Sequence, residues 1–120
     1  MELRELFDFI GKQNEILDRR YYEDFSERER TLERVLKVNE EFGELCDEIL
    51  RRFGSQRREK VENDITHEVA DVLICVLLLA DSLGVDVERA LEEKIGKVKG
   101  RFREEWEDEE DENLSAGDAD

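Results

Sequence analysis

Apolar residues recur with a helical period along the first half of the chain. One such stripe predicts a first helix over about residues 2–20: Leu3, Leu6, Phe7, Ile10 and Leu17. The segment YYEDF that follows is predicted to be a connection. Ser26 and Glu29 have the S-x-x-E spacing of a capping box, so a second helix is predicted from there to about Phe53.

Two further helices are predicted after the break at Gly54-Ser55. The third covers about residues 59–83 and ends at Gly84, a residue type that favours helix C-termini. Asp86 is a candidate N-cap for the fourth, which reaches about Phe102 although Gly96 and Gly100 weaken its pattern. We therefore predict an all-α, four-helix bundle-like subunit.

The third helix is apolar on nearly every side from Val69 to Ala80. A helix of this kind must be surrounded, and three other helices would struggle to cover it. A second subunit is therefore expected to supply part of the cover, giving a helical dimer or a dimer of dimers.

Composition agrees with short connections between helices, because the chain has no proline and 45% charged residues in 120 positions. The net charge of −16 is uneven: residues 104–120 hold ten acidic and no basic groups. We therefore expect one domain over residues 1–103 and an acidic, disordered tail over residues 104–120. The acidic body argues against nucleic-acid binding, which needs a basic patch.

Cys46 and Cys75 both lie within helical apolar patterns and form no CxxC motif. With no secretory signal, they are expected to be small buried hydrophobic residues in a reducing compartment. The longest apolar run is too short to span a bilayer. The chain is therefore expected to be soluble and cytoplasmic, with no membrane partner.

The second helix carries the carboxylates of N39-EEFGE-L45. Its helical period predicts one buried stripe: Val35, Val38, Phe42, Leu45, Cys46, Ile49 and Phe53. Glu41 and Glu44 are spaced i,i+3 on one shoulder of that stripe, whereas Glu40 faces solvent more. Glu48 is one turn further on and could assist.

The third helix repeats this spacing with Glu68 and Asp71, and Asp64 lies one turn earlier. If the two helices are antiparallel, four carboxylates meet near the core and repel one another. A divalent cation would neutralise them, and ligation by oxygen alone suits Mg²⁺ or Mn²⁺ rather than zinc.

Two other interpretations of these acidic residues stay open. EExxE by itself is usually a solvated helix face. Asp64-x-x-His67 resembles half of a di-iron ligand set, but such a site needs two pairs and the chain has one histidine. His67 is expected to be a surface or interface residue.

The order and spacing of these motifs resemble a known family. EEFGE at 40–44, a gap of 23 residues and EVAD at 68–71 are similar to the EExxE…ExxD signature of MazG-like nucleotide pyrophosphohydrolases. These enzymes belong to the all-α NTP pyrophosphatase superfamily. The similarity extends through LGVDVERALEEKIGKVKGRF, so it covers about residues 30–103.

The resemblance implies a Mg²⁺-dependent enzyme that hydrolyses a nucleoside triphosphate to the monophosphate and pyrophosphate, working as a homodimer or homotetramer. By position, it implies the metal ligands Glu41, Glu44, Glu68 and Asp71. Glu40 would be a supporting or water-orienting group. From the chemistry of carboxylates, Glu41 or Glu44, and after them Glu40, are the candidates to orient the attacking water or accept its proton. The basic residues implied to contact phosphates are Lys37, Lys94, Lys97, Lys99 and Arg101.

One departure from the family pattern supports an alternative function. Val98 stands where many relatives carry an asparagine. A catalytically inactive helical dimer that binds nucleotides or another protein therefore stays open. Four aromatic residues could stack on a base or simply pack in the core: Phe7, Tyr21, Tyr22 and Phe25.

Overall fold

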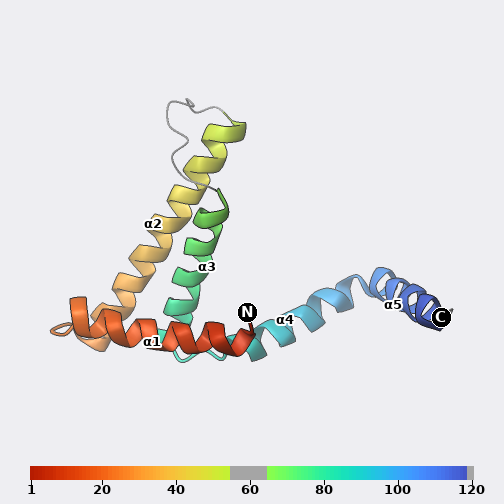
Figure 1. Cartoon of the computed structure of the whole chain (residues 1–120), viewed down its shortest axis with the longest axis horizontal. Coiled ribbons are helices and arrows are strands. Elements are labelled where there is room, and N and C mark those ends of the chain that lie inside the picture. The colour runs from red at the N-terminus through yellow and green to blue at the C-terminus, as the bar shows by residue number, and fades with distance from the viewer. Residues whose placement is uncertain (55–64, 119–120) are drawn as a thin grey trace. The chain divides into compact units, whose positions relative to one another are not determined.

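The structure, a computed structural model, describes residues 1–54 and 65–118. Its regular elements are all helices in this described part, which confirms the predicted all-α class. Figure 1 labels them in chain order: α1 (Leu3–Tyr21), α2 (Glu27–Phe53), α3 (Ile65–Ser82), α4 (Val87–Arg101) and α5 (Arg103–Asp118). The expected start of the third helix, residues 59–64, lies outside the described residues.

The predicted helix starts are confirmed by their capping hydrogen bonds. At α2 the Glu29 backbone N–H donates to Ser26 Oγ over 3.1 Å, and the Ser26 backbone N–H donates to Glu29 Oε1 over 3.0 Å. This reciprocal pair satisfies two donors that a helix N-terminus otherwise leaves free. At α4 the Arg89 backbone N–H donates to Asp86 Oδ1 over 3.1 Å.

Gly84 ends α3 as its position in the sequence predicts. Its φ of +71° lies in the left-handed region that glycine enters at no steric cost. The Val85 and Gly84 N–H groups then donate to the carbonyls of Ala80 and Asp81, each over 3.0 Å. These bonds close the last turn and separate α3 from α4.

The chain divides into two compact units, residues 1–85 and 86–120. In the first unit α2 and α3 lie side by side and α1 crosses beside them (Figure 1). Arg34 and Leu78 line the same cavity, while Glu41 lies close to Glu68 and Asp71. Earlier residues of α2 thus meet later residues of α3, so the two helices are antiparallel.

A buried polar network joins the three helices of the first unit. Arg34 of α2 is 5% exposed. Its Nε donates to Asn14 Oδ1 and its Nη2 donates to Asp18 Oδ1, each over 2.7 Å. Asn14 Nδ2 in turn donates to the Leu78 carbonyl over 3.0 Å and to Asp81 Oδ2 over 2.8 Å. The network therefore holds α1 against both other helices through directional bonds.

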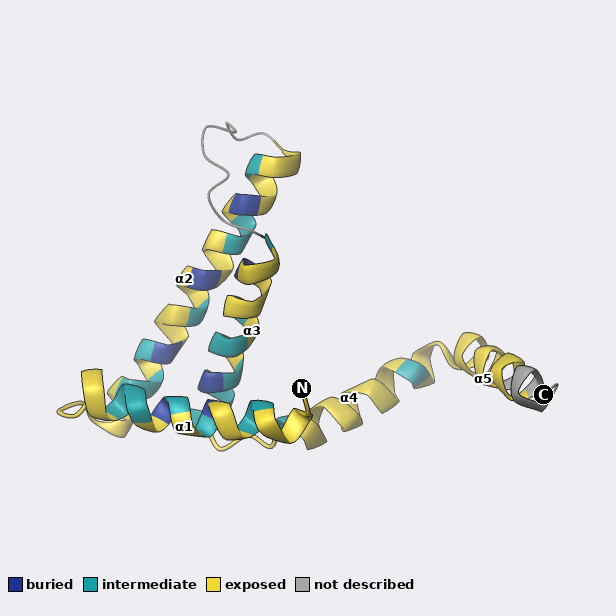
Figure 2. Ribbon diagram, viewed as in Figure 1, coloured by how far each residue is buried: buried dark blue, intermediate teal, exposed yellow. Residues whose placement is uncertain are grey.

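The predicted buried stripe of α2 is wrong for the single chain. Four of its residues are exposed: Val35, Phe42, Ile49 and Phe53. The buried residues of α2 are instead Arg34, Glu41 and Glu48, as the isolated dark positions along this helix in Figure 2 illustrate. The helix turns its charged shoulder toward α3, so that four of the seven stripe residues are exposed and the other three, Val38, Leu45 and Cys46, are half-buried.

The second unit contains α4 and α5. Where the charge run led us to expect a disordered tail, residues 103–118 form α5. Glutamate has a high helix propensity, and the acidic residues of the first turn favour the positive end of the helix dipole. Arg103 Nε also pairs with Glu107 Oε1 over 3.0 Å, and the Lys99 ammonium lies 4.8 Å from the centre of the Trp106 ring.

None of the helices in the described part of the chain combines the length and the apolar character needed to cross a bilayer.

Candidate metal centre

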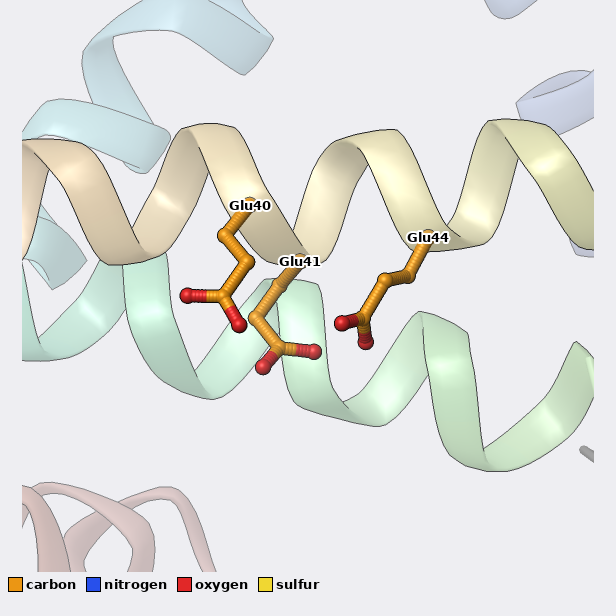
Figure 3. Close-up of side chains that lie close together, drawn as sticks. All are labelled: Glu40, Glu41 and Glu44. Atoms are coloured by element: carbon orange, nitrogen blue, oxygen red, sulfur yellow. The ribbon is translucent and has the colours of Figure 1, made fainter.

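Three carboxylates of α2 come together on one side of the helix. Glu40, Glu41 and Glu44 each place a carboxylate oxygen within 4.8 Å of the others. Figure 3 shows their side chains projecting from the same stretch of α2. The i,i+3 and i,i+4 spacing of EExxE brings such side chains together on a helix surface.

Glu41 also belongs to a second group, which spans two helices. A carboxylate oxygen of Glu41 lies within 4.8 Å of oxygens from Glu68 and Asp71 of α3. The antiparallel packing of α2 and α3 therefore joins the two halves of the motif, with Glu41 common to both groups. The charge of Glu68 on α3 also contributes to raising the pKa of Glu44.

The two groups differ in burial. Glu41 is 9% exposed and Glu68 is 4% exposed, whereas Glu40, Glu44 and Asp71 are exposed. One oxygen of Glu68, Oε2, is fully buried and has no hydrogen-bond partner among the described residues. A buried carboxylate oxygen without a partner is costly unless a proton or a cation meets it.

Crowding of like charges changes the acidity of Glu44. Its pKa is raised above the ordinary value of 4.5, mainly by the neighbouring charge of Glu41, with smaller contributions from desolvation and from Glu68 and Glu40. A divalent cation at this position would oppose the shift, because it stabilises the ionised carboxylates.

The carboxylates present fit a hard divalent cation. Oxygens that share one octahedral Mg²⁺ at about 2.1 Å lie about 3 to 4.2 Å from each other, so groups within 4.8 Å need little adjustment. The donors are all carboxylates, as Mg²⁺ and Mn²⁺ prefer. Glu41, Glu68 and Asp71 would hold such an ion between the helices, and Glu44 would join from the neighbouring group.

Comparison with known proteins agrees with this motif geometry. The model of the MazG-like family matches residues 33–115, which include both carboxylate groups. The chain belongs to the MazG-like family. It is also similar to the "Uncharacterized protein YpjD" of Bacillus subtilis (strain 168), with 31% identity over 74 residues that cover 60% of this chain and 67% of that protein. No solved structure matches the chain.

The region matched by the family model has other limits than the domain predicted over residues 1–103. It extends past residue 103 into the acidic segment and includes most of α5. It begins at Glu33, so α1 lies outside the matched region.

Lys37 was predicted to contact phosphates, but its ion pairs with Glu40 and Glu41 were not predicted from the sequence. Lys37 Nζ lies 3.3 Å from Glu41 Oε1 and 3.5 Å from Glu40 Oε2. Partial burial works to lower the pKa of Lys37, but the hydrogen bond to Glu41 and the charges of Glu40 and Glu41 outweigh it and raise the pKa. The i,i+4 spacing of Lys37 and Glu41 was the available signal.

Glu48 is buried on the same side of α2 but is held differently. It is 3% exposed, and its Oε1 pairs with Arg51 over 3.2 Å. Its Oε2 has no hydrogen-bond partner among the residues described. Glu48 is not a member of either carboxylate group, so the arrangement assigns it no ligand position.

A cavity of about 240 Å³ lies beside the cluster in this MazG-like chain. All three helices of the first unit line it, with Gln13 from α1, Glu33 and Lys37 from α2, and Cys75 from α3; Tyr22, directly after α1, lines it as well. Lys37 connects the cavity to Glu41, and Cys75 is one helical turn beyond Asp71. The cavity thus adjoins the carboxylates along both α2 and α3.

The four aromatic residues proposed to stack on a base differ in their exposure and in whether they line this cavity. Tyr22 lines it and packs against Phe25 with ring centres 5.2 Å apart, and its backbone carbonyl accepts a bond from Arg30 Nε over 2.9 Å. Tyr21 is 61% exposed, Phe25 is 37% exposed and Phe7 is half-buried. Tyr22 is therefore the only one of the four that lines this cavity.

Among the described residues, the remaining sequence-predicted ones belong to neither carboxylate group. Lys94, Lys97 and Arg101 are exposed on α4 in the second unit, so their contact with phosphates stays a prediction. His67 is exposed, and Asp64 lies outside the described residues. Both cysteines are half-buried free thiols rather than fully buried. Burial, together with the charge of Glu41, raises the pKa of the Cys75 thiol.

Proposed function

We propose that this MazG-like protein is a divalent-metal-dependent nucleoside triphosphate pyrophosphohydrolase. The observation that carries the proposal is the meeting of Glu41 with Glu68 and Asp71, which brings the two halves of the motif within 4.8 Å. Glu68 adds a buried oxygen without a hydrogen-bond partner among the described residues, which a bound cation would stabilise. Membership in the MazG-like family makes a nucleotide the natural substrate.

The carboxylates would divide the work according to the group to which they belong. Glu41, Glu68 and Asp71 hold the cation between α2 and α3. Bound Mg²⁺ or Mn²⁺ supplies charge neutralisation at phosphate oxygens and lowers the pKa of a water. Glu44 accepts the proton of the attacking water, because it is exposed and its carboxylate lies within 4.8 Å of Glu41, the member shared by both groups. Glu40 orients the same water from the neighbouring turn.

The nucleoside would occupy the cavity beside the cluster. A triphosphate held at Glu41 would then have its sugar and base directed toward Tyr22, whose ring offers a flat apolar surface. The basic residues Lys94, Lys97 and Arg101 remain the candidates for the outer phosphates.

Replacing Tyr22 with Ala is expected to raise KM for the preferred nucleotide by about tenfold, because stacking of a base on an aromatic ring contributes roughly 1–3 kcal/mol. Steady-state pyrophosphate release measures this. Tyr21→Ala is the matched control, since Tyr21 is exposed and does not line the cavity. Equal KM values for the two variants would contradict the placement of the nucleoside in this cavity.

A second copy of the chain would cover the apolar stripe of α2. Val35, Phe42 and Ile49 recur at seven-residue intervals and are all exposed, and Leu73 of α3 is 58% exposed. Exposed apolar side chains in such a row are typical of an interface between subunits.

In sedimentation velocity we expect the wild-type chain at twice or four times its 14.2 kDa mass. Ile49→Arg should shift it toward the monomer, since it places a charge within the proposed interface. Leu114→Arg, a change at an exposed residue of α5, serves as control. A monomeric wild-type protein at micromolar concentration would contradict this assembly.

The reaction is tested by incubating purified protein with Mg²⁺ and a panel of ribo-, deoxyribo- and modified nucleoside triphosphates. Anion-exchange chromatography should show monophosphate and pyrophosphate, with no diphosphate or orthophosphate. Release from none of them, in Mg²⁺ or Mn²⁺, would reject the enzyme. Nucleotide binding without release would instead support the inactive binding protein.

A further inference from the structure

Lys37 occupies an unusual place for a lysine on a helix surface. Its ammonium reaches inward to Glu41, whose side chain is 11% exposed, over 3.3 Å. It also lies 3.5 Å from both oxygens of Glu40. Within the described part of the chain, no other lysine or arginine pairs with a member of the two carboxylate groups.

The other lysine–glutamate pair on the first unit differs in its surroundings. Lys12 and Glu15 approach to 3.8 Å, but their side chains are 65% and 69% exposed. Such a pair contributes little because water screens it. Lys37 instead meets a nearly buried carboxylate that two groups share, where screening is weaker and crowding of negative charge is greatest.

The carboxylate of Glu41 is also one that a divalent cation would need, because it belongs to both carboxylate groups. An ammonium 3.3 Å from Glu41 Oε1 and an ion bound by Glu41, Glu68 and Asp71 would repel each other across a few ångströms. The side chain of Lys37 is 54% exposed, so it can rotate away into water. The two cations are thus competitors for one carboxylate.

We infer that Lys37 is the resident counter-ion of the carboxylate centre: it stabilises Glu41 and Glu40 before a divalent cation binds and is displaced when one arrives. This inference rests on the proposed metal centre. It gives Lys37 a role that precedes any contact with substrate. Once displaced, the ammonium is free to meet an anionic phosphate, so metal occupancy prepares the site for the nucleotide.

The inference is tested without nucleotide by thermal unfolding of the full chain during a titration with MgCl₂, starting from EDTA. Lys37→Met removes the charge and keeps much of the side-chain length. We expect its Tm in EDTA to fall by about 2 to 5 °C. Its apparent Kd for Mg²⁺, taken from the dependence of Tm on metal, should be about three- to fivefold tighter than that of the wild type.

Two further variants make the result specific. Lys37→Arg keeps the positive charge, so its Tm in EDTA and its Mg²⁺ affinity should both stay close to the wild-type values. Lys12→Met removes the exposed lysine and should change neither quantity. The opposite signs of the two effects in Lys37→Met distinguish a competing counter-ion from a residue that only supports the fold.

Unchanged or weaker Mg²⁺ affinity in Lys37→Met would overturn the inference. A wild-type chain that binds neither Mg²⁺ nor Mn²⁺ would overturn it together with the metal centre. Hydrolysis is measured separately by pyrophosphate release. A protein that binds metal as expected but releases no pyrophosphate would leave the role of Lys37 intact and reject only the reaction.

Discussion

Replacing Glu41 with Gln is expected to lower pyrophosphate release by at least about 10²- to 10³-fold, the loss typical of removing one preorganised charge-stabilising group. Glu41 is the member common to both carboxylate groups, so its change affects the ion, the neighbouring Glu44 and the alignment of α2 with α3 at once. Gln has nearly the same shape but carries no charge. Turnover of the best nucleotide in saturating Mg²⁺ measures the effect.

Glu40→Gln is the matched control for this prediction. Glu40 is adjacent in sequence and equally acidic, but it is exposed and belongs to one group only. Its change should cost about tenfold, as loss of a supporting partner near a metal does. Equal losses in the two variants would contradict the central position of Glu41.

The second large effect concerns stability. Arg34→Leu is expected to lower the free energy of unfolding by about 2 to 3 kcal/mol, because it removes the short bonds from the buried guanidinium to Asn14 and Asp18 that join α2 to α1. The value lies at the lower end for a buried pair, since the side chain of Asp18 is 30% exposed. Urea unfolding at one fixed protein concentration measures it, as assembly also contributes.

Two variants bracket the Arg34 result. Arg34→Lys keeps the charge but loses the planar fork that bonds Asn14 and Asp18 together, so an intermediate loss is expected. Arg28→Leu alters an exposed arginine of the same helix and should stay within about 0.5 kcal/mol of the wild type. If Arg34→Leu also stays within that range, the network does not hold α1 in place.

Local signals in the sequence were sufficient for helices α1 to α4 and for the spacing of the carboxylates. The capping box of Ser26 and Glu29, the Asp86 N-cap and the Gly84 terminus each depend on neighbours within five residues. The i,i+3 pairs of EExxE and ExxD are equally local. Antiparallel packing of two helices then brings the pairs together.

The direction in which α2 faces could not be predicted in this way. Periodicity identifies an apolar stripe but not which surface covers it. Phe42 is 56% exposed while its neighbour Glu41 is nearly buried against α3. In the single chain the charged shoulder of α2 faces α3 and part of its apolar stripe is exposed, so the rule that apolar residues lie inside does not predict the orientation of this helix.

Contacts between distant residues were also beyond the sequence. Arg34 lies next to an apolar stripe in the sequence, and no local pattern identifies Asn14, twenty positions earlier, as its hydrogen-bond partner.

The acidic composition of the segment that forms α5 led to an expectation of disorder. Composition alone does not include pairing at i,i+4 spacing, such as the ion pair between Arg103 and Glu107.

A divalent cation held by Glu41, Glu68 and Asp71 is the central feature of the proposed function. Its most direct test is a titration of Mn²⁺ into wild-type and Asp71→Asn protein, with free Mn²⁺ followed by electron paramagnetic resonance. We expect the wild-type chain to remove Mn²⁺ from solution and Asp71→Asn to bind it at least about tenfold more weakly. Equal binding by the two proteins would contradict the assignment of these carboxylates as the metal centre.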